Sequence, residues 1–265
     1  MDVKALIQRL QLPSYFMLAY DITWLGILLI LVASGFQLGT LPQGSVALIF
    51  FAMLLGPSLS SIFMTALLSG RDGFRQLWSR EKRLQVAPRW AALALLTVPL
   101  LVLAILLPLR LVASPVYLPG FQPVGLVIGL LAGLFEELGW TGFATPRLLE
   151  KYSPLKAGLL LGLLWSFWHV LADFVSNIST MGAGWVIWFL IFWILPLTAY
   201  RTLMTWLYSH TKSLFWAQLM HASYTGWLLT LSPATSFNQG LVWQILFAAG
   251  LWIMVILLVR PGPKA

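Results

Sequence analysis

The chain has 265 residues, of which 60% are hydrophobic and 9% charged, whereas soluble domains average about 45–50% and about 25%. Sixteen Lys or Arg and eight Asp or Glu residues are too few to cover a domain in water, so the composition excludes a soluble globule. The absence of cysteine excludes disulfides, thiolate nucleophiles and cysteine-bound zinc. Chemistry must therefore come from carboxylates, hydroxyls, amides and three histidines.

Long apolar stretches are separated by clusters of glycine, proline, serine and charged residues. A membrane-spanning helix needs roughly 20 mostly apolar residues, and these stretches lack the period-two alternation of an outer-membrane barrel. The sequence predicts an all-α polytopic membrane protein with a bundle of about eight transmembrane helices, in a single integral-membrane domain over 1–265. The expected spans are 14–36, 44–69, 90–112, 122–146, 155–176, 183–208, 213–231 and 240–259.

The distribution of basic residues predicts the topology. With the N-terminus in the cytoplasm, 15 of the 16 basic residues fall on the cytoplasmic side and only Arg110 lies outside. The positive-inside rule thus favours an N-in, C-in protein of the cytoplasmic membrane. The cytoplasmic set is Lys4, Arg9, Arg71, Arg75, Arg80, Lys82, Arg83, Arg89, Arg147, Lys151, Lys156, Arg201, Lys212, Arg260 and Lys264.

The net charge of +8 is therefore a topology signal and does not indicate nucleic-acid binding, which would need a continuous soluble basic face. The longest polar stretch, 70–89, is predicted to be a short basic loop along anionic lipid headgroups. We expect membrane lipids, and no nucleic acid, as partners.

Ionisable residues at membrane depth are costly and mark a functional site by default. Glu136 and Glu137 on the fourth expected span, His169 on the fifth and His221 on the seventh come out near one depth at about 1.5 Å per residue. We expect these four to form a catalytic site within a core of about 122–231. Since adjacent carboxylates in low dielectric cannot both ionise cheaply, one of them suits a general base.

Helical spacing adds neighbours to this set. Asp173 follows His169 by four residues and is predicted to orient its imidazole. Trp165 lies one turn before His169 on the same face, where ordinary packing is the favoured interpretation. Thr225 follows His221 by one turn. From the residues alone, such acids and histidines also fit the proton relay of a proton-coupled transporter, although no inverted repeat is visible.

Three motifs, in this order, are similar to a known family. The first is EELGWTGFATPRL at 136–148, which resembles E-E-x-x-x-R with a trailing G-F-A-x-P-R-L. The second is WSFWH at 165–169, which corresponds to F/W-x-x-x-H. The third is HASYT at 221–225, where the family has H-x-x-x-N or D. Together they resemble the CPBP family of intramembrane proteases, the CAAX-protease and bacteriocin-processing family also called Abi.

The resemblance implies a peptide hydrolase whose cavity opens toward the cytoplasm. Glu136 would activate a water molecule, and Glu137, His169 and His221 would line the site. The implied substrate is a membrane-associated protein, prenylated at a CAAX-type terminus, or a bacteriocin-like peptide. Two options stay open for a cofactor: Zn²⁺ bound by His169, His221 and Glu136, or no metal, with His221 as the oxyanion donor.

The sequence departs from the family pattern at two positions. Thr141 replaces the motif arginine, so Glu137 would need another partner or would remain protonated. Thr225 replaces the terminal Asn but keeps a hydroxyl donor. The alternative is therefore a cleavage-incompetent relative that acts in immunity or regulation by binding.

Overall fold

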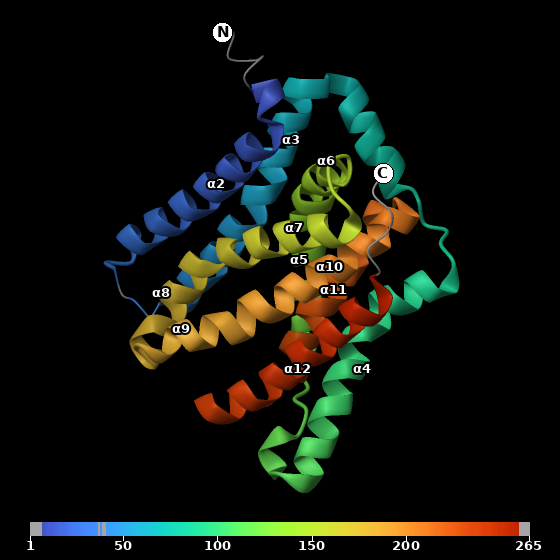
Figure 1. Cartoon of the computed structure of the whole chain (residues 1–265). Helices are drawn as coiled ribbons and strands as arrows, with labels where there is room; N and C mark the ends of the chain where they lie inside the picture. The colour runs from blue at the N-terminus through green and yellow to red at the C-terminus, as the bar shows by residue number, and fades with distance from the viewer. Residues whose placement is uncertain (1–6, 37, 39–40, 260–265) are drawn as a thin grey trace.

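The structure is a computed structural model that describes residues 7–36, 38 and 41–259. These residues form helices without any β-strand, which confirms the all-α prediction (Figure 1). The helices are α2 (Gln11–Ala33), α3 (Gln43–Glu81), α4 (Pro88–Val112), η1 (Pro115–Tyr117), α5 (Val124–Gly139), η2 (Trp140–Ala144), α6 (Thr145–Leu149), α7 (Pro154–Trp168), α8 (Val170–Met181), α9 (Gly184–Phe189), η3 (Leu190–Ile194), α10 (Leu195–Thr211), α11 (Leu214–Leu231) and α12 (Phe237–Leu258).

The described residues contain six helical runs that are long and apolar enough to cross a membrane, or seven if the bent pair α7 and α8 forms one span. Each of the eight predicted stretches is helical, but the seventh, α11, does not reach the apolarity of a span. It carries Gln218, His221 and Ser223, and it packs against α4 and α5 inside the bundle. The protein is therefore polytopic, with six or seven candidate spans among the described residues where the sequence predicts eight.

One end of the bundle carries Arg80, Arg83 and Arg147, and we call this end the basic face. The beginnings of α2 and α11 meet the ends of α3, α6 and α10 there, as the predicted alternation of spans requires. The connecting hydrogen bonds join Gln11 to Arg147, Arg80 to Tyr208, and Arg83 to Ser213. Lys4, Arg260 and Lys264, which the topology prediction also uses, lie outside the described residues.

Two expectations about basic residues are wrong. The stretch after Gly70 is not a loop up to Arg89, because α3 continues as a helix to Glu81 after a bend, visible at the top of Figure 1. Gly70 makes this bend with a φ of 53°, a value that glycine adopts without steric cost. Arg201 is not in a cytoplasmic connection; it lies within α10 and is completely buried.

The helices near the predicted site are irregular. The single straight span expected over 155–176 is instead α7 and α8, bent by 48° at His169. Two π-helical turns, η2 directly after the two glutamates and η3 before α10, interrupt the other spans. Turns of this kind often occur at functional sites because they reorient side chains within a helix. Here η2 carries Trp140 and η3 carries Trp193.

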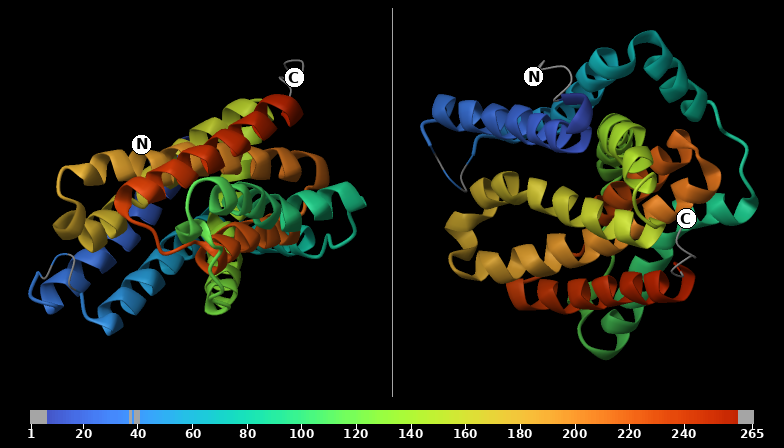
Figure 2. Two further views of the ribbon diagram at one scale, coloured as in Figure 1. Left: turned by 90° about the horizontal axis from the view of Figure 1, so that it is seen from below. Right: turned by 45° about the horizontal axis from the view of Figure 1, so that its top comes forward.

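Two rows of glycine residues, which we call glycine seams, let α5 pack closely against α11 and α7 against α10. A Cβ atom on Gly129 of α5 would lie 2.4 Å from the backbone of α11, and one on Gly133 would lie 2.3 Å from it. On α7, a Cβ on Gly158 or Gly162 would lie 2.6 or 2.7 Å from the backbone of α10. Small residues of this kind let helix backbones approach closely in a membrane. Figure 2 shows the result for α7, which runs alongside α10, with α12 on the other side of α10.

Candidate active site

Glu137 lies at the centre of a buried charged network. Arg201 donates from Nη2 to Oε1 over 2.6 Å and from Nη1 to Oε2 over 2.8 Å. His221 Nδ1 donates to Oε1 over 2.7 Å, and the hydroxyl of Thr141 donates to Oε2. A carboxylate has about four acceptor positions, so these four hydrogen bonds occupy all of them. Glu137 is thereby fixed in place and has no acceptor position left for a substrate or water.

Arg201 supplies the positive charge that the motif lacks at Thr141. It reaches Glu137 from α10, 64 positions along the chain, and its side chain is completely buried. The bidentate pairing of a guanidinium with a carboxylate is the strongest geometry for such a pair. The positive-inside rule placed Arg201 on the cytoplasmic side, so this residue was not predicted as part of the site. Position 201 falls inside the predicted span 183–208, so the rule on ionisable residues at membrane depth already pointed to it.

Glu136 has a different environment from its neighbour. Its Oε2 accepts hydrogen bonds from the indole Nε1 of Trp165 over 3.1 Å and of Trp140 over 3.3 Å. Among the described residues it has no salt-bridge partner, and Oε1 accepts no hydrogen bond. Its side chain is 4% exposed. Glu136 is therefore the carboxylate with a free oxygen atom, as a general base requires.

Trp165 connects all members of the site. Besides its hydrogen bond to Glu136, its ring lies 4.1 Å from the guanidinium of Arg201. It also makes edge contacts with the rings of His221 at 5.0 Å and His169 at 5.8 Å. Packing alone is thus an incomplete interpretation of this residue. Its indole N–H orients the carboxylate of Glu136, and its ring packs against the guanidinium of Arg201.

His169 sits at the junction of α7 and α8, but Asp173 does not orient it directly. The Nδ1 of His169 donates to the backbone oxygen of Trp165 over 2.8 Å, because a carbonyl can only accept. Asp173 instead accepts from Trp193 and Trp185, both over 2.7 Å. Trp193 stacks on the His169 ring at 4.2 Å, so Asp173 acts on the imidazole only through this indole.

The two imidazoles each keep one nitrogen atom available. With Nδ1 of His169 and of His221 engaged, neither Nε2 has a hydrogen-bond partner among the described residues. Thr225 lies one turn after His221, half-buried, and does not take part in the contacts to Glu137. The predicted four residues therefore converge, with Trp165 and Thr141, while Asp173 and Thr225 stand at the margin.

The zinc alternative places a metal ion between His169, His221 and Glu136. Within the described part of the chain, no three His, Asp or Glu side chains gather closely enough to hold a metal ion. A zinc site needs three or four ligands converging at about 2.0–2.2 Å. In the described residues, His169, His221 and Glu136 are not arranged as a zinc ligand set.

These features define a class: a polytopic helical membrane protein with an ionisable site buried between its helices. Residues 118–227 match the family model described as type II CAAX prenyl endopeptidase Rce1-like. A curated relative, CAAX prenyl protease 2 of Methanococcus maripaludis, is 37% identical over 103 residues. That match spans 38% of this chain and 38% of the relative. The matched segment contains all four predicted catalytic residues and is similar to the family that the motifs resemble.

Proposed function

We propose that the protein is an intramembrane endopeptidase that hydrolyses a peptide bond with water activated by Glu136. The family match and the similarity to a CAAX prenyl protease support peptide hydrolysis. The observation that carries the proposal is the difference between two adjacent carboxylates. Glu137 is saturated by Arg201, His221 and Thr141, whereas Glu136 is held only by indole N–H groups. Contrasting environments of this kind separate a reactive carboxylate from a structural one.

The proposed reaction starts with Glu136 ionised and with N–H groups at both ring nitrogens of His221. Glu136 and Glu137 are then balanced by Arg201 and His221. A cluster that is neutral as a whole is the least costly way to keep ionised groups in a low dielectric. In this state Glu136 can accept a proton. His221, whose Nδ1 donates to Glu137, offers its Nε2–H group to the substrate.

In the proposed reaction, Glu136 removes a proton from water while the water oxygen adds to the carbonyl carbon of the peptide. Nε2–H of His221 donates a hydrogen bond to the developing oxyanion. Nε2 of the neutral His169 accepts a hydrogen bond from the same water and orients it. Glu136 then transfers its proton to the amide nitrogen as the C–N bond breaks, which releases a carboxylic acid and an amine and restores the base.

We infer that the substrate is a membrane-associated protein or peptide, because the site is enclosed by helices long and apolar enough to span a membrane. A protein with a prenylated CAAX-type terminus is the first candidate, on the wording of the family description and of the relative's name. A bacteriocin-like precursor is the second. We expect the substrate to enter from the cytoplasmic side, where the positive-inside rule puts the basic face.

The test uses the full chain in lipid nanodiscs with a quenched fluorescent peptide that ends in a CAAX sequence, with and without a prenyl group. Glu136→Gln keeps the shape of the side chain and removes the base, so we expect cleavage to fall by about 10²–10⁴-fold. The matched control is Asp72→Asn, an exposed carboxylate that is distant in the chain from the site. It should retain wild-type activity.

Unfolding temperatures of both variants show whether a loss of cleavage reflects chemistry or folding. Equal activity of Glu136→Gln and the wild type would overturn the glutamate mechanism. The cleavage-incompetent alternative makes a separate prediction, namely that no peptide of either kind is cleaved by the wild type while binding persists. Its main motivation was the missing charge at Thr141, and Arg201 supplies that charge from another helix.

A further inference from the structure

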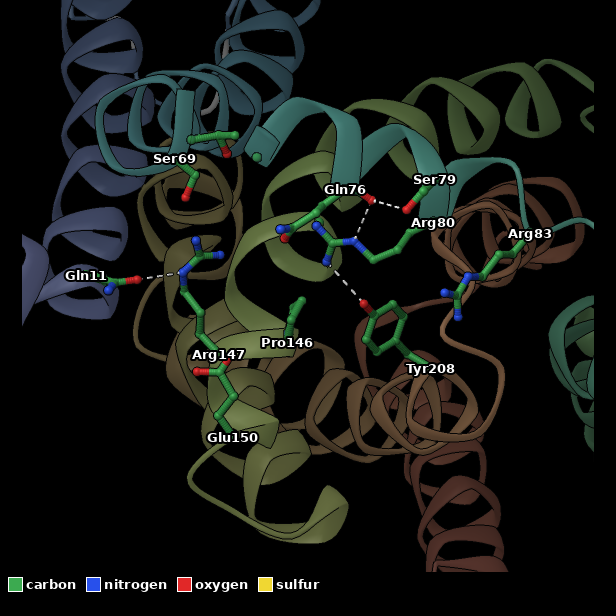
Figure 3. A pocket seen from close by; sticks show the side chains of 13 residues that line it. Gln11, Ser69, Gln76, Ser79, Arg80, Arg83, Pro146, Arg147, Glu150 and Tyr208 are labelled. Atoms are coloured by element: carbon green, nitrogen blue, oxygen red, sulfur yellow. Dashed lines mark hydrogen bonds between the residues drawn. The ribbon is translucent and has the colours of Figure 1, made fainter. Parts of the chain in front are cut away.

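The basic face contains a polar pocket of about 490 Å³ that the proposed mechanism does not use. It lies between the beginning of α2, the end of α3, the end of α6 and the end of α10. Figure 3 shows its labelled side chains converging from these helices. The pocket is lined mainly by guanidinium, amide and hydroxyl groups. The charged and aromatic members of the lining are Arg80, Arg83, Arg147, Glu150 and Tyr208.

The charges in this pocket do not cancel. Three arginines face one glutamate, which leaves two net positive charges. Among the described residues, neither Arg80 nor Arg147 has a carboxylate within salt-bridge distance; the ion pairs found there are Arg75 with Asp72 and the two to Glu137. Unpaired guanidinium groups that are half-buried together repel each other. An anion from outside the chain would remove this cost.

The two half-buried guanidinium groups are held in place by neutral partners. Arg80 donates from Nη1 to the hydroxyl of Tyr208 over 3.1 Å and from Nε to the backbone oxygen of Gln76 over 3.2 Å. Arg147 donates from Nε to Gln11 Oε1 and from Nη1 to the backbone oxygen of Phe143, both over 2.9 Å. It also stacks 3.7 Å from the ring of Phe143.

Each of these arginines thus spends two of its five N–H donors on orientation and keeps three for a ligand. Fixed guanidinium forks match the oxygens of phosphate and carboxylate groups. The two net charges of the pocket favour a phosphate group, which carries up to two charges and three free oxygens. The hydroxyl group of Ser69, which also lines the pocket, adds a donor that a tetrahedral oxyanion can use, whereas that of Ser79 donates to the backbone oxygen of Gln76 over 2.8 Å.

The position of the pocket indicates where the phosphate comes from. The walls are the ends of apolar helices, which places the pocket at the boundary between the apolar layer and water. The segment of α3 after Gly70 exposes Phe74 and Trp78 beside it, with 38% and 59% of their surfaces accessible. Exposed aromatic residues at helix ends are typical of the headgroup level of a bilayer. Basic pockets between helices at this level bind phosphorylated lipid headgroups.

We propose that this pocket binds the phosphate group of an anionic membrane lipid, with Arg80 and Arg147 as the main ligands and Arg83 as a third. The preferred headgroup is a phosphomonoester, as in phosphatidic acid, because it brings two charges. Phosphatidylglycerol, a singly charged diester, binds more weakly, and phosphatidylcholine does not bind selectively. None of the residues that line this pocket belongs to the proposed peptidase centre.

The test measures lipid retention by native mass spectrometry of the full chain released from nanodiscs of phosphatidylcholine with a minor fraction of phosphatidic acid or phosphatidylglycerol. It uses the Glu136→Gln background, so the result is independent of any peptidase activity. We expect Arg80→Gln with Arg147→Gln to reduce retention of phosphatidic acid by about tenfold or more, the effect of losing charge-assisted bidentate contacts. The matched control, Arg71→Gln with Arg75→Gln, removes the same charge from exposed positions outside the pocket and should change retention by less than about twofold.

Equal losses in the two double variants would overturn the site in favour of general surface attraction. If the first double variant fails to fold, Tyr208→Phe, which removes one partner of Arg80 and little volume, should reduce retention by about two- to threefold. Unchanged retention in that variant would count against the proposal. Two competition arms identify the source of the anion. Displacement of phosphatidic acid by millimolar inorganic phosphate would overturn the lipid source, and displacement by a peptide with a free C-terminal carboxylate would overturn phosphate as the ligand.

Discussion

The protein contains two groups of arginine residues with opposite electrostatic situations. Arg201 lies in the middle of the bundle, where Glu137 and His221 complete a cluster that contains both signs of charge. Arg80 and Arg147 lie in the pocket on the basic face, where one glutamate faces three arginines. In the interior, Arg201 and Glu137 supply each other's counter-charge. At the boundary the chain orients the cations with neutral partners and leaves the counter-charge to come from outside.

The difference follows from the cost of burial. An unpaired charge in the apolar interior costs several kcal/mol, so a fold that contains one must also contain its partner. At the membrane surface, water and lipid headgroups provide that partner. A residue of the first kind is therefore part of the folded structure, and a residue of the second kind is available for binding.

The largest effect on stability is expected from Arg201→Met, which leaves Glu137 buried without its cation. Breaking a buried pair in this way costs about 3–5 kcal/mol of unfolding free energy. The measurement is thermal or denaturant unfolding in detergent, followed by tryptophan fluorescence. A loss below about 1 kcal/mol, the usual value for a surface ion pair, would show that the pair is not buried as the structure has it.

Moving the cation back to the family position is expected to recover part of that loss. Thr141→Arg in the Arg201→Met background places a guanidinium one helical turn after Glu137, and we expect about 1–3 kcal/mol of stability to return. Thr141→Arg alone is the control. It puts two guanidinium groups at one carboxylate and should destabilise the protein. Additive effects of the two changes in this double-mutant cycle would contradict the exchange of one arginine for the other.

An effect on catalysis, smaller than the stability loss of Arg201→Met, is expected from Trp165→Phe, which removes the hydrogen bond to Glu136 and keeps an aromatic ring over Arg201. The loss of one hydrogen bond to a charged group corresponds to about 1.5–3 kcal/mol, or roughly a tenfold to hundredfold lower kcat/KM. Trp168→Phe is the matched control on the same helix, because the Trp168 Nε1 is buried without a partner. Equal losses in both variants would mean that the indole N–H of Trp165 has no specific role.

The smallest effect is expected from Arg80→Gln in detergent without anionic lipid. Its partners are a hydroxyl and a backbone oxygen, so the change should alter the unfolding free energy by no more than about 1 kcal/mol. Comparison with Arg201→Met in the same unfolding assay measures the contrast directly. If the unfolding free energy fell as much as in Arg201→Met, Arg80 would be a residue that the fold needs, and it would not be available for a ligand.

Much of the fold and of the site was predictable from sequence. The length of the apolar stretches and the glycine, proline, serine and charged clusters between them predicted that all eight stretches are helical. The end of α3 was predicted wrongly, because the stretch 70–89 has a polar composition typical of a loop although the helix continues past Gly70. Membrane depth and motif spacing selected Glu136, Glu137, His169 and His221, which do converge. Helical spacing predicts that Asp173 orients His169, but Nδ1 of His169 donates to the backbone oxygen of Trp165, and Asp173 binds Trp185 and Trp193.

The sequence by itself determined that the chain is an all-α membrane protein and which acids and histidines lie at one depth, because both follow from composition and from the rise of a helix. Only the tertiary structure decided which carboxylate is saturated and which is free. That distinction depends on Arg201 and Trp165 reaching the glutamates from α10 and α7, at distances along the chain that no local pattern covers. The glycine seams make these approaches close enough for hydrogen bonds, and their effect appears only when the helices are packed.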